Sequence, residues 1–218
     1  HFAQANWYAY GRMAWNPDLS SEEIADEWIR QTFTDDADFV NPIKELMLES
    51  RENTVRYEMP MGLHHTFAGA GHYGPGPWEG SIRPDWSPMY YHKAGPDGVG
   101  FDRTKKGSGN VGQYHEPLAS MYGNVETCPE ELILWFHHLP WDYKMKSGRT
   151  LMQELEYRYQ RGVNEVIDFI TTWQNAKPYI DAQRWQEVND KLTLQLISAR
   201  EWQQVCTKYF GSFAQPQK

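Results

Sequence analysis

The strongest constraint on the fold is the apolar periodicity of the last third of the chain. Apolar residues recur there at spacings of three and four, the pattern of a helix with one buried face. One such segment starts at the capping residue Thr150 and ends near Lys177-Pro178, and a second runs from Asp181 to Gly211, which we expect to close it. Long helices joined by a short turn are expected to form an antiparallel pair. The apolar positions are Leu151, Leu155, Tyr159, Val163, Val166, Ile170 and Trp173, then Trp185, Val188, Leu192, Leu196, Ala199, Trp202, Val205 and Tyr209.

The first 58 residues also carry helix signals. A helix over residues 2–15 is ended by Asn16-Pro17, because the residue before a proline avoids helical geometry. Ser20 and Glu23 form a capping-box pattern, which predicts the start of a second helix. Asn41-Pro42 reads as an N-cap followed by proline, so we expect a third helix from there to about Glu58.

Residues 59–126 differ from the rest. This stretch holds most of the glycine and proline of the chain, with little helical period. It is also rich in aromatic residues, unlike a linker, and loops this long in compact domains are usually functional. After it, Thr127 with Glu130 predicts a capped helix over "EELILWFHHL". We therefore expect one mainly α-helical domain over residues 1–218, with helices in 1–58 and 127–211 and a long aromatic loop region in 59–126.

Composition excludes some classes of partner. The net charge is −8 at pH 7, which argues against nucleic acid and, more weakly, against anionic membranes. No apolar run approaches the roughly 20 residues of a transmembrane helix. Cys128 and Cys206 form no motif, so the disulfide state and the compartment stay open.

Short motifs for catalysis are absent. The sequence has no nucleophile elbow, phosphate-binding loop or dinucleotide fingerprint. Its histidines lack the spacing of a zinc site, so we expect no metal and no cofactor. Glycoside hydrolysis needs two carboxylates at a defined separation, and nothing singles out a pair. The carboxylates considered are Asp85, Asp102, Glu116, Glu126 and Asp142.

Aromatic residues carry the strongest functional signal, with 10 Trp, 13 Tyr and 9 Phe. The opening "HFAQANWYAYGRMAWN" has the aromatic density of a face that packs against another domain. In the loop region, Trp78 and Trp86 lie among prolines, which lower the ordering cost of binding. Their flat rings fit the C–H faces of sugars, and the alternative is that they anchor the loop to the helices. We take Trp78, Trp86, His65, Tyr91 and Arg103 as candidate substrate-binding residues.

Several long segments together resemble the C-terminal region of the family 67 α-glucuronidases. They are "HFAQANWYAYGRMAWNPDLSSEEIADEWIRQTF", "GLHH" with "HYGPGP", "RPDWSPMYYHKA", "GVGFDRT", "QYHEPL" and "ETCPEELILWFHHLPWDYKMKSGRTL". The resemblance implies a helical domain that follows a (β/α)8 barrel in an inverting enzyme. That enzyme removes glucuronic acid or its 4-O-methyl form from xylo-oligosaccharides. It also implies that the catalytic carboxylates lie on the barrel and not in this chain.

The same resemblance implies partners. The C-terminal domain of such enzymes contacts the barrel, forms the homodimer and supplies a tryptophan to the xylan side of the cleft, a part that Trp78 or Trp86 could play. We therefore expect a bracing and substrate-lining domain that is inactive alone. The alternatives are a stand-alone carbohydrate-binding module and a metal-dependent enzyme that uses the histidine-rich loop.

Overall fold

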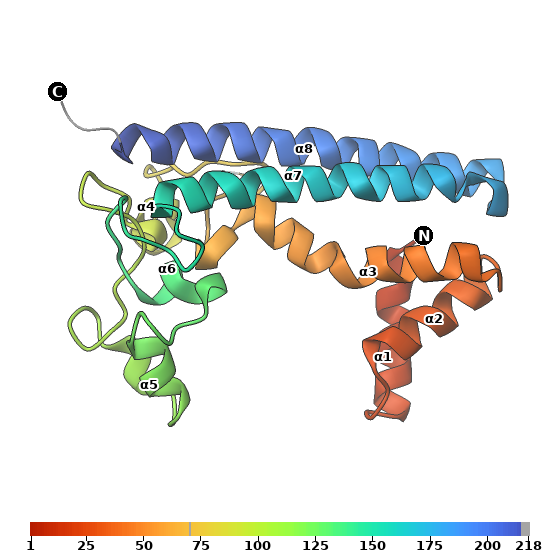
Figure 1. Cartoon of the computed structure of the whole chain (residues 1–218), viewed down its shortest axis with the longest axis horizontal. Coiled ribbons are helices and arrows are strands. Elements are labelled where there is room, and N and C mark those ends of the chain that lie inside the picture. The colour runs from red at the N-terminus through yellow and green to blue at the C-terminus, as the bar shows by residue number, and fades with distance from the viewer. Residues whose placement is uncertain (70, 215–218) are drawn as a thin grey trace. The chain divides into compact units, whose positions relative to one another are not determined.

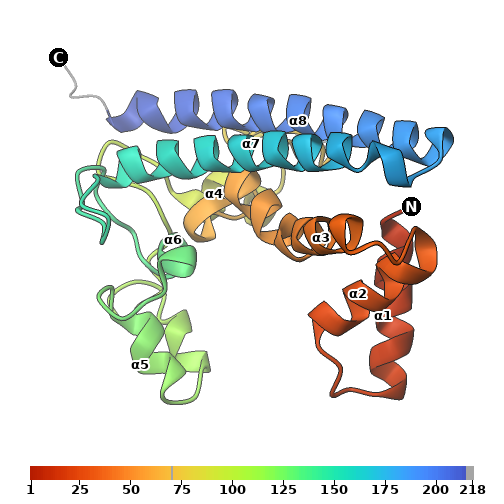
Figure 2. The ribbon, with the colours of Figure 1, turned by 45° about the vertical axis from the view of Figure 1, so that its right-hand side comes forward.

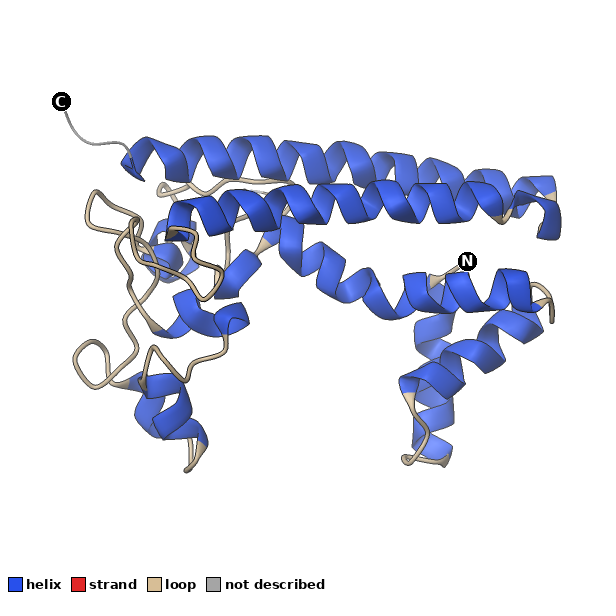
Figure 3. Ribbon diagram, in the orientation of Figure 1, coloured by secondary structure: helices blue, strands red, loops and turns tan. Residues whose placement is uncertain are grey.

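The computed structural model describes residues 1–69 and 71–214, and it confirms the mainly α-helical class (Figure 1). Within these residues the chain forms helices joined by loops and a few isolated β-bridges, with no strand (Figure 3). The helices are α1 (Ala3–Trp15), α2 (Ser21–Thr32), α3 (Ala37–Glu58), α4 (Pro88–His92), α5 (Leu118–Gly123), α6 (Ile133–Phe136), α7 (Leu151–Asn175) and α8 (Ala182–Ala214).

Side-chain caps fix where several helices begin. The Ser20 hydroxyl accepts from the Glu23 amide and the Glu23 carboxylate accepts from the Ser20 amide, so the predicted capping box of α2 is confirmed. Thr150 does the same for α7, exchanging hydrogen bonds with Gln153. Asp181 accepts the Arg184 amide at the start of α8. These bonds occupy amides that have no partner inside the helix.

Three sequence-based boundaries are wrong. The third helix starts at Ala37 rather than at Asn41-Pro42, because the Asp36 carboxylate caps it by accepting the Asp38 amide. Pro42 lies in the second turn, where its missing N–H costs one helix hydrogen bond.

The other two boundaries lie further along the chain. The Thr127 hydroxyl donates to the carbonyls of Met121 and Asn124 instead of capping a helix, and α6 is a single turn. Gly211 does not close α8, which continues to Ala214.

The chain forms two compact units, and α3, α7 and α8 contribute to both. The first unit comprises residues 1–53 and 164–197. In it, α1 packs against α2, and the end of α7 lies beside the start of α8 (Figure 2). Its core is a cluster of buried apolar side chains around Trp28, Phe39 and Trp173. The remaining members are Ala5, Ile29, Val40, Ile43, Phe169, Ala176, Val188 and Leu192.

The second unit comprises residues 54–163 and the chain from Ser198 onward. In it, α7 crosses α3 closely at Gly162, where a Cβ atom would lie 2.8 Å from the Tyr57 amide nitrogen. The loops of this unit are joined by the bridge between Val99 and Leu139. Gly98 precedes that bridge with a φ of 148°, and a Cβ there would lie 2.1 Å from the Leu139 carbonyl oxygen. Only glycine fits this approach.

A buried carboxylate ties the start of α7 to the loop before it. The side chain of Glu154 is 4% exposed and accepts hydrogen bonds from Ser147, Arg149 and Arg158. Arg158 also pairs with Glu130, at 3.0 Å. Burial alone would raise the pKa of Glu154, but its three hydrogen-bond donors hold that pKa below its usual range. No helix in the described part of the chain is both long and apolar enough to cross a membrane.

Candidate functional site

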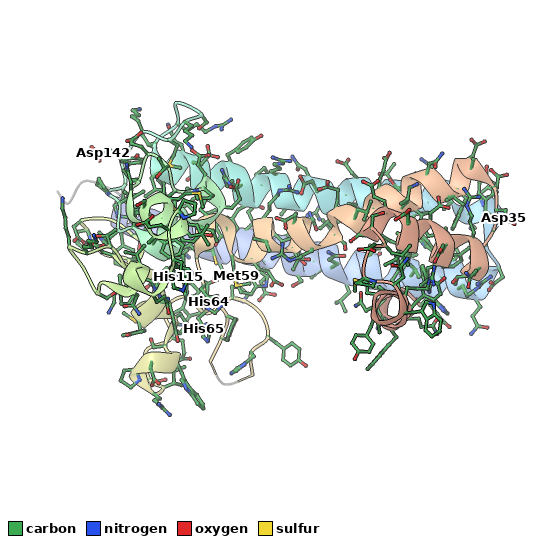
Figure 4. The ribbon with its side chains drawn as sticks, turned by 90° about the horizontal axis from the view of Figure 1, so that it is seen from below. Asp35, Met59, His64, His65, His115 and Asp142 are labelled. Carbon is green, nitrogen blue, oxygen red and sulfur yellow. The ribbon has the colours of Figure 1, made fainter. Side chains whose placement is uncertain are left out.

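The loop region of the second unit gathers a group of rings that we call the histidine–aromatic cluster: His64, His65, Tyr91, Arg103 and Trp135. The His65 ring stacks on the Tyr91 ring at a centroid distance of 4.4 Å. Tyr91 in turn lies nearly parallel to Trp135, with centroids 6.3 Å apart. His64 meets Trp135 edge-on at 5.2 Å, and its Nδ1 contacts that of His65. Figure 4 labels these two histidines, whose ring centroids lie 4.4 Å apart.

The backbone around the cluster adopts rare conformations. His65 has a φ of 57°, Met61 a φ of 61° and Lys93 a φ of 47°. Left-handed geometry is uncommon for residues other than glycine and costs free energy. At His65 this free-energy cost is borne by the loop in which the His65 ring stacks on Tyr91. Such a conformation persists only where the surroundings fix it.

Arg103 supplies a buried positive charge to the cluster. The residue is 8% exposed, and its guanidinium lies 3.7 Å from the centroid of the Trp135 ring. It donates to the Trp135 carbonyl and contacts the Phe101 ring. Within the described residues, no carboxylate pairs with it. Burial is the main reason that its pKa is lowered, while nearby tyrosines act in the opposite direction. A cation held this way is stabilised by rings and a carbonyl rather than by a carboxylate.

The two imidazoles of the cluster are neutral near pH 7. Burial lowers the pKa of His64, with smaller contributions in the same direction from His65 and Arg103. Burial also lowers the pKa of His65, with a smaller contribution from His72. A neutral imidazole offers one hydrogen-bond donor and one acceptor, which suits a hydroxyl group. The cluster therefore combines flat apolar faces, neutral polar groups and one cation.

Trp78 lies on a loop that is held from two sides. His92 is buried, and its Nε2–H donates to the Pro77 carbonyl at 2.8 Å, while the Ala94 amide donates to its Nδ1. The Ser87 hydroxyl donates to the Glu79 carbonyl at 2.7 Å. The Trp78 side chain itself is 55% exposed and has the Tyr209 ring at 6.3 Å. The backbone on either side of Trp78 is thus held in place, while more than half of the residue stays exposed.

Trp86 lies on a neighbouring turn that is joined to the cluster. The Tyr91 hydroxyl donates to the Asp85 carbonyl at 2.8 Å. Arg83 pairs with the Asp85 carboxylate and has its guanidinium 5.5 Å from the centroid of the Trp86 ring. Trp86 is 57% exposed. The turn therefore presents a second accessible tryptophan next to the cluster.

Metal ligation was the alternative for the histidine-rich loop. Among the described residues, no three His, Cys, Asp or Glu side chains are grouped so that they could hold a metal ion. His64 and His65 contact each other and aromatic rings instead.

Comparison with known proteins decides the family. The model for the C-terminus of glycosyl hydrolase family 67 matches residues 1–218. The chain belongs to this family, as its C-terminal domain. It is 37% identical to α-glucuronidase A of Emericella nidulans over 212 residues, which is 96% of this chain and 25% of that protein. It is 33% identical to the probable α-glucuronidase A of Aspergillus clavatus over 218 residues, 98% of this chain and 25% of the relative. The chain thus spans about a quarter of the length of the curated relatives it matches.

Within this family 67 domain, the structure brings together three of the five predicted site residues. His65, Tyr91 and Arg103 lie in the histidine–aromatic cluster, and the Trp86 turn is hydrogen-bonded to it. The Trp78 ring lies against Tyr209 in α8 instead. That these five residues bind substrate stays a prediction.

Sequence reasoning missed two members of the cluster. Trp135 and His64 are not among the candidate residues, yet both rings contact Tyr91. Arg103 and Trp135 are 32 residues apart, so their spacing in the sequence does not predict the hydrogen bond between them. The signal that could have found Trp135 is the aromatic density of "LWFHHLPW".

Proposed function

We propose that this domain forms the xylan-facing wall of an α-glucuronidase that removes glucuronic acid, or its 4-O-methyl form, from xylo-oligosaccharides. The chemistry belongs to a catalytic barrel in the same polypeptide, and the domain contributes binding surface. The relatives are named α-glucuronidases, and this chain matches only a quarter of their length, which supports a division of labour.

The observation that carries the proposal is the fixed, half-exposed Trp78. A sugar stacks well on a ring that does not have to be ordered first. The hydrogen bonds from His92 and Ser87 supply that order within the second unit itself. Trp86 and the histidine–aromatic cluster add a second ring, neutral imidazoles and a cation nearby. Together these groups match a neutral chain of xylose units that carries an acidic branch.

The same domain braces the barrel through α1. Trp7 is 80% exposed and Trp15 is 87% exposed, with Tyr10 also open to solvent. The one charged residue of the helix, Arg12, is paired with Glu27 at 2.7 Å, which leaves an uncharged aromatic surface. Such surfaces mark contacts with other protein. A homodimer contact on α8 is supported by the exposed Leu194 and Ile197.

Titration of the chain with xylotriose and aldotetraouronic acid, followed by tryptophan fluorescence, tests the proposal. We expect saturable binding that the Trp78→Ala variant weakens by about tenfold, which corresponds to about 1.4 kcal/mol. Tyr157→Ala is the matched control, since this exposed tyrosine lies on α7 and contacts Arg149. Fluorescence that does not change with either sugar would contradict a preformed wall.

A stand-alone carbohydrate-binding module is the second candidate, because Trp78 and Trp86 are both exposed in one unit. It predicts equally tight binding of polymeric xylan by the chain alone. Our proposal instead predicts a preference for the short, glucuronate-bearing oligosaccharide.

A further inference from the structure

Two neighbouring residues of α4 hold the backbone beside the two accessible tryptophans. The Nε2–H of His92 donates to the carbonyl of the residue before Trp78, at 2.8 Å. The hydroxyl of Tyr91 donates to the carbonyl of the residue before Trp86, also at 2.8 Å. One helical turn therefore holds the two tryptophan loops through two separate hydrogen bonds.

The turn that carries Trp86, residues 83–86, has little other support. Its remaining bonds are local, since the Trp86 amide donates to the Arg83 carbonyl at 2.8 Å and the Arg83 guanidinium donates to the Asp85 carboxylate. The same guanidinium lies 5.5 Å from the centroid of the Trp86 ring. Among the described residues, Tyr91 is the one side chain from outside the turn that hydrogen-bonds to it.

The Tyr91 ring is in turn packed by rings of the histidine–aromatic cluster and of its own helix. His65 stacks on it at a centroid distance of 4.4 Å, and Trp135 lies nearly parallel to it at 6.3 Å. Tyr90 meets it edge-on at 5.3 Å. Tyr91 thus connects the exposed turn to side chains that lie far from it in the sequence.

We propose that Tyr91 is a positioning residue, which holds the Trp86 ring in place for a ligand and does not bind the ligand itself. The sequence instead placed Tyr91 among the candidate substrate-binding residues. The inference rests on the proposed function for the identity of the ligand, whereas the position of Trp86 is a property of the free chain. Because His92 holds the other loop, removal of the Tyr91 hydroxyl should disturb Trp86 and leave Trp78 unchanged.

The first measurement uses the whole chain without ligand. NMR signals of the ¹⁵N-labelled indoles, assigned with Trp78→Phe and Trp86→Phe, report on each ring separately. Tyr91→Phe keeps the stacked ring and removes only the hydroxyl. We expect this variant to shift the Trp86 signal and to lower its heteronuclear NOE, with the Trp78 signal unchanged.

Tyr90→Phe is the matched control. This neighbouring tyrosine is 40% exposed, and its hydroxyl has no hydrogen-bond partner among the described residues. It should therefore leave both indole signals in place. An unmoved Trp86 signal in Tyr91→Phe, or the same change in Tyr90→Phe, would overturn the positioning role.

A double-mutant cycle with xylotriose then separates positioning from direct contact with the ligand. Tyr91→Phe should weaken binding about fivefold, which corresponds to about 1 kcal/mol, the contribution of an ordinary hydrogen bond. The same change should have no further effect in the Trp86→Ala background and its full effect in the Trp78→Ala background. An undiminished loss in the Trp86→Ala background would mean that Tyr91 does not act through Trp86.

The two measurements also keep this inference apart from the proposed function. If xylotriose bound to none of these proteins, the proposed function would fail. The indole signals of the free chain would still decide whether Tyr91 positions Trp86.

Discussion

The Nε2–H of His92 donates to the carbonyl of Pro77 at 2.8 Å, and this bond joins α4 to the loop that carries Trp78. The imidazole is buried against Tyr209 and Phe210 of α8. A single side chain thus connects the exposed ring that we assign to sugar binding with the packed interior of its unit.

Burial of the His92 imidazole makes stability depend on pH, while its bond to Pro77 opposes the effect. Burial lowers the pKa of His92 to about 4, below the value of about 6.5 that it takes when unfolded. Between those values the unfolded chain binds a proton that the native state does not, so stability falls as the pH drops from about 6.5 to 4. The loss attributable to His92 is ~3 kcal/mol. Urea unfolding of wild type and His92→Gln across this range measures it.

The glutamine variant keeps a donor near the position of Nε2 but does not titrate. We expect a weaker decline of stability with acid than in wild type. An identical pH profile for the two proteins would show that His92 is not the responsible group.

Glu154 tests the buried ionic network of α7. Glu154→Ala removes the carboxylate that Arg149 and Arg158 share. Arg158 keeps its pair with Glu130 and Arg149 is partly exposed, so we expect a loss of about 1.5–3 kcal/mol, the range for hydrogen bonds to charged groups. Glu156→Ala, at an exposed position of the same helix, should change stability by less than about 0.5 kcal/mol. Thermal and urea unfolding of both variants check this. Similar decreases in the free energy of unfolding for the two variants would show that the ion pairs of Glu154 do not stabilise the fold.

Two tryptophans hold the turn between α7 and α8. The Trp173 indole donates to the Trp185 carbonyl at 2.9 Å, and the Trp185 indole donates to the Trp173 carbonyl at 3.1 Å. Trp173→Phe leaves a carbonyl without its donor and should lower the free energy of unfolding by about 2 kcal/mol. Trp15→Phe, on an exposed face, is the control and should be neutral. An unchanged free energy of unfolding for Trp173→Phe would mean that water replaces the indole N–H as the donor to the Trp185 carbonyl.

Both cysteines should be unreactive in the folded chain. They are free and buried, and burial raises the pKa of Cys128 to about 11 and that of Cys206 to about 12. Only the thiolate reacts rapidly, so a thiol reagent at pH 8 should label neither cysteine until denaturant is added. Rapid labelling of the native protein would contradict this burial.

The sequence predicted helix starts well where a side chain a few residues away caps the helix. The capping bonds of Ser20 and Thr150 depend on residues three positions away, which a sequence displays directly. The third helix start was misplaced because Asp36 competes with Asn41 as a cap, and tertiary packing of Phe39 and Val40 favours the longer helix. The dipeptide Asn41-Pro42 is compatible both with a helix that starts there and with one that starts at Ala37, so it does not distinguish the two.

The candidate site shows the opposite limit. Composition pointed to the right loop region, but the contacts inside it join residues far apart in the sequence. His65 stacks on Tyr91, and Arg103 lies over Trp135. No spacing rule predicts such contacts, because they depend on how the loops pack. The left-handed backbone of His65 is equally hidden, since such geometry is uncommon even for histidine, although histidine adopts it more often than most residues.

The most direct test of the central claim is the kinetics of a family 67 α-glucuronidase that carries this chain as its C-terminal domain. The claim is that the domain binds the xylan part of the substrate and performs no chemistry. Trp78→Ala should raise KM for aldotetraouronic acid about tenfold and leave kcat unchanged, the signature of lost uniform binding. Tyr157→Ala should change neither constant. A fall in kcat at constant KM, or wild-type values for both constants, would contradict the account.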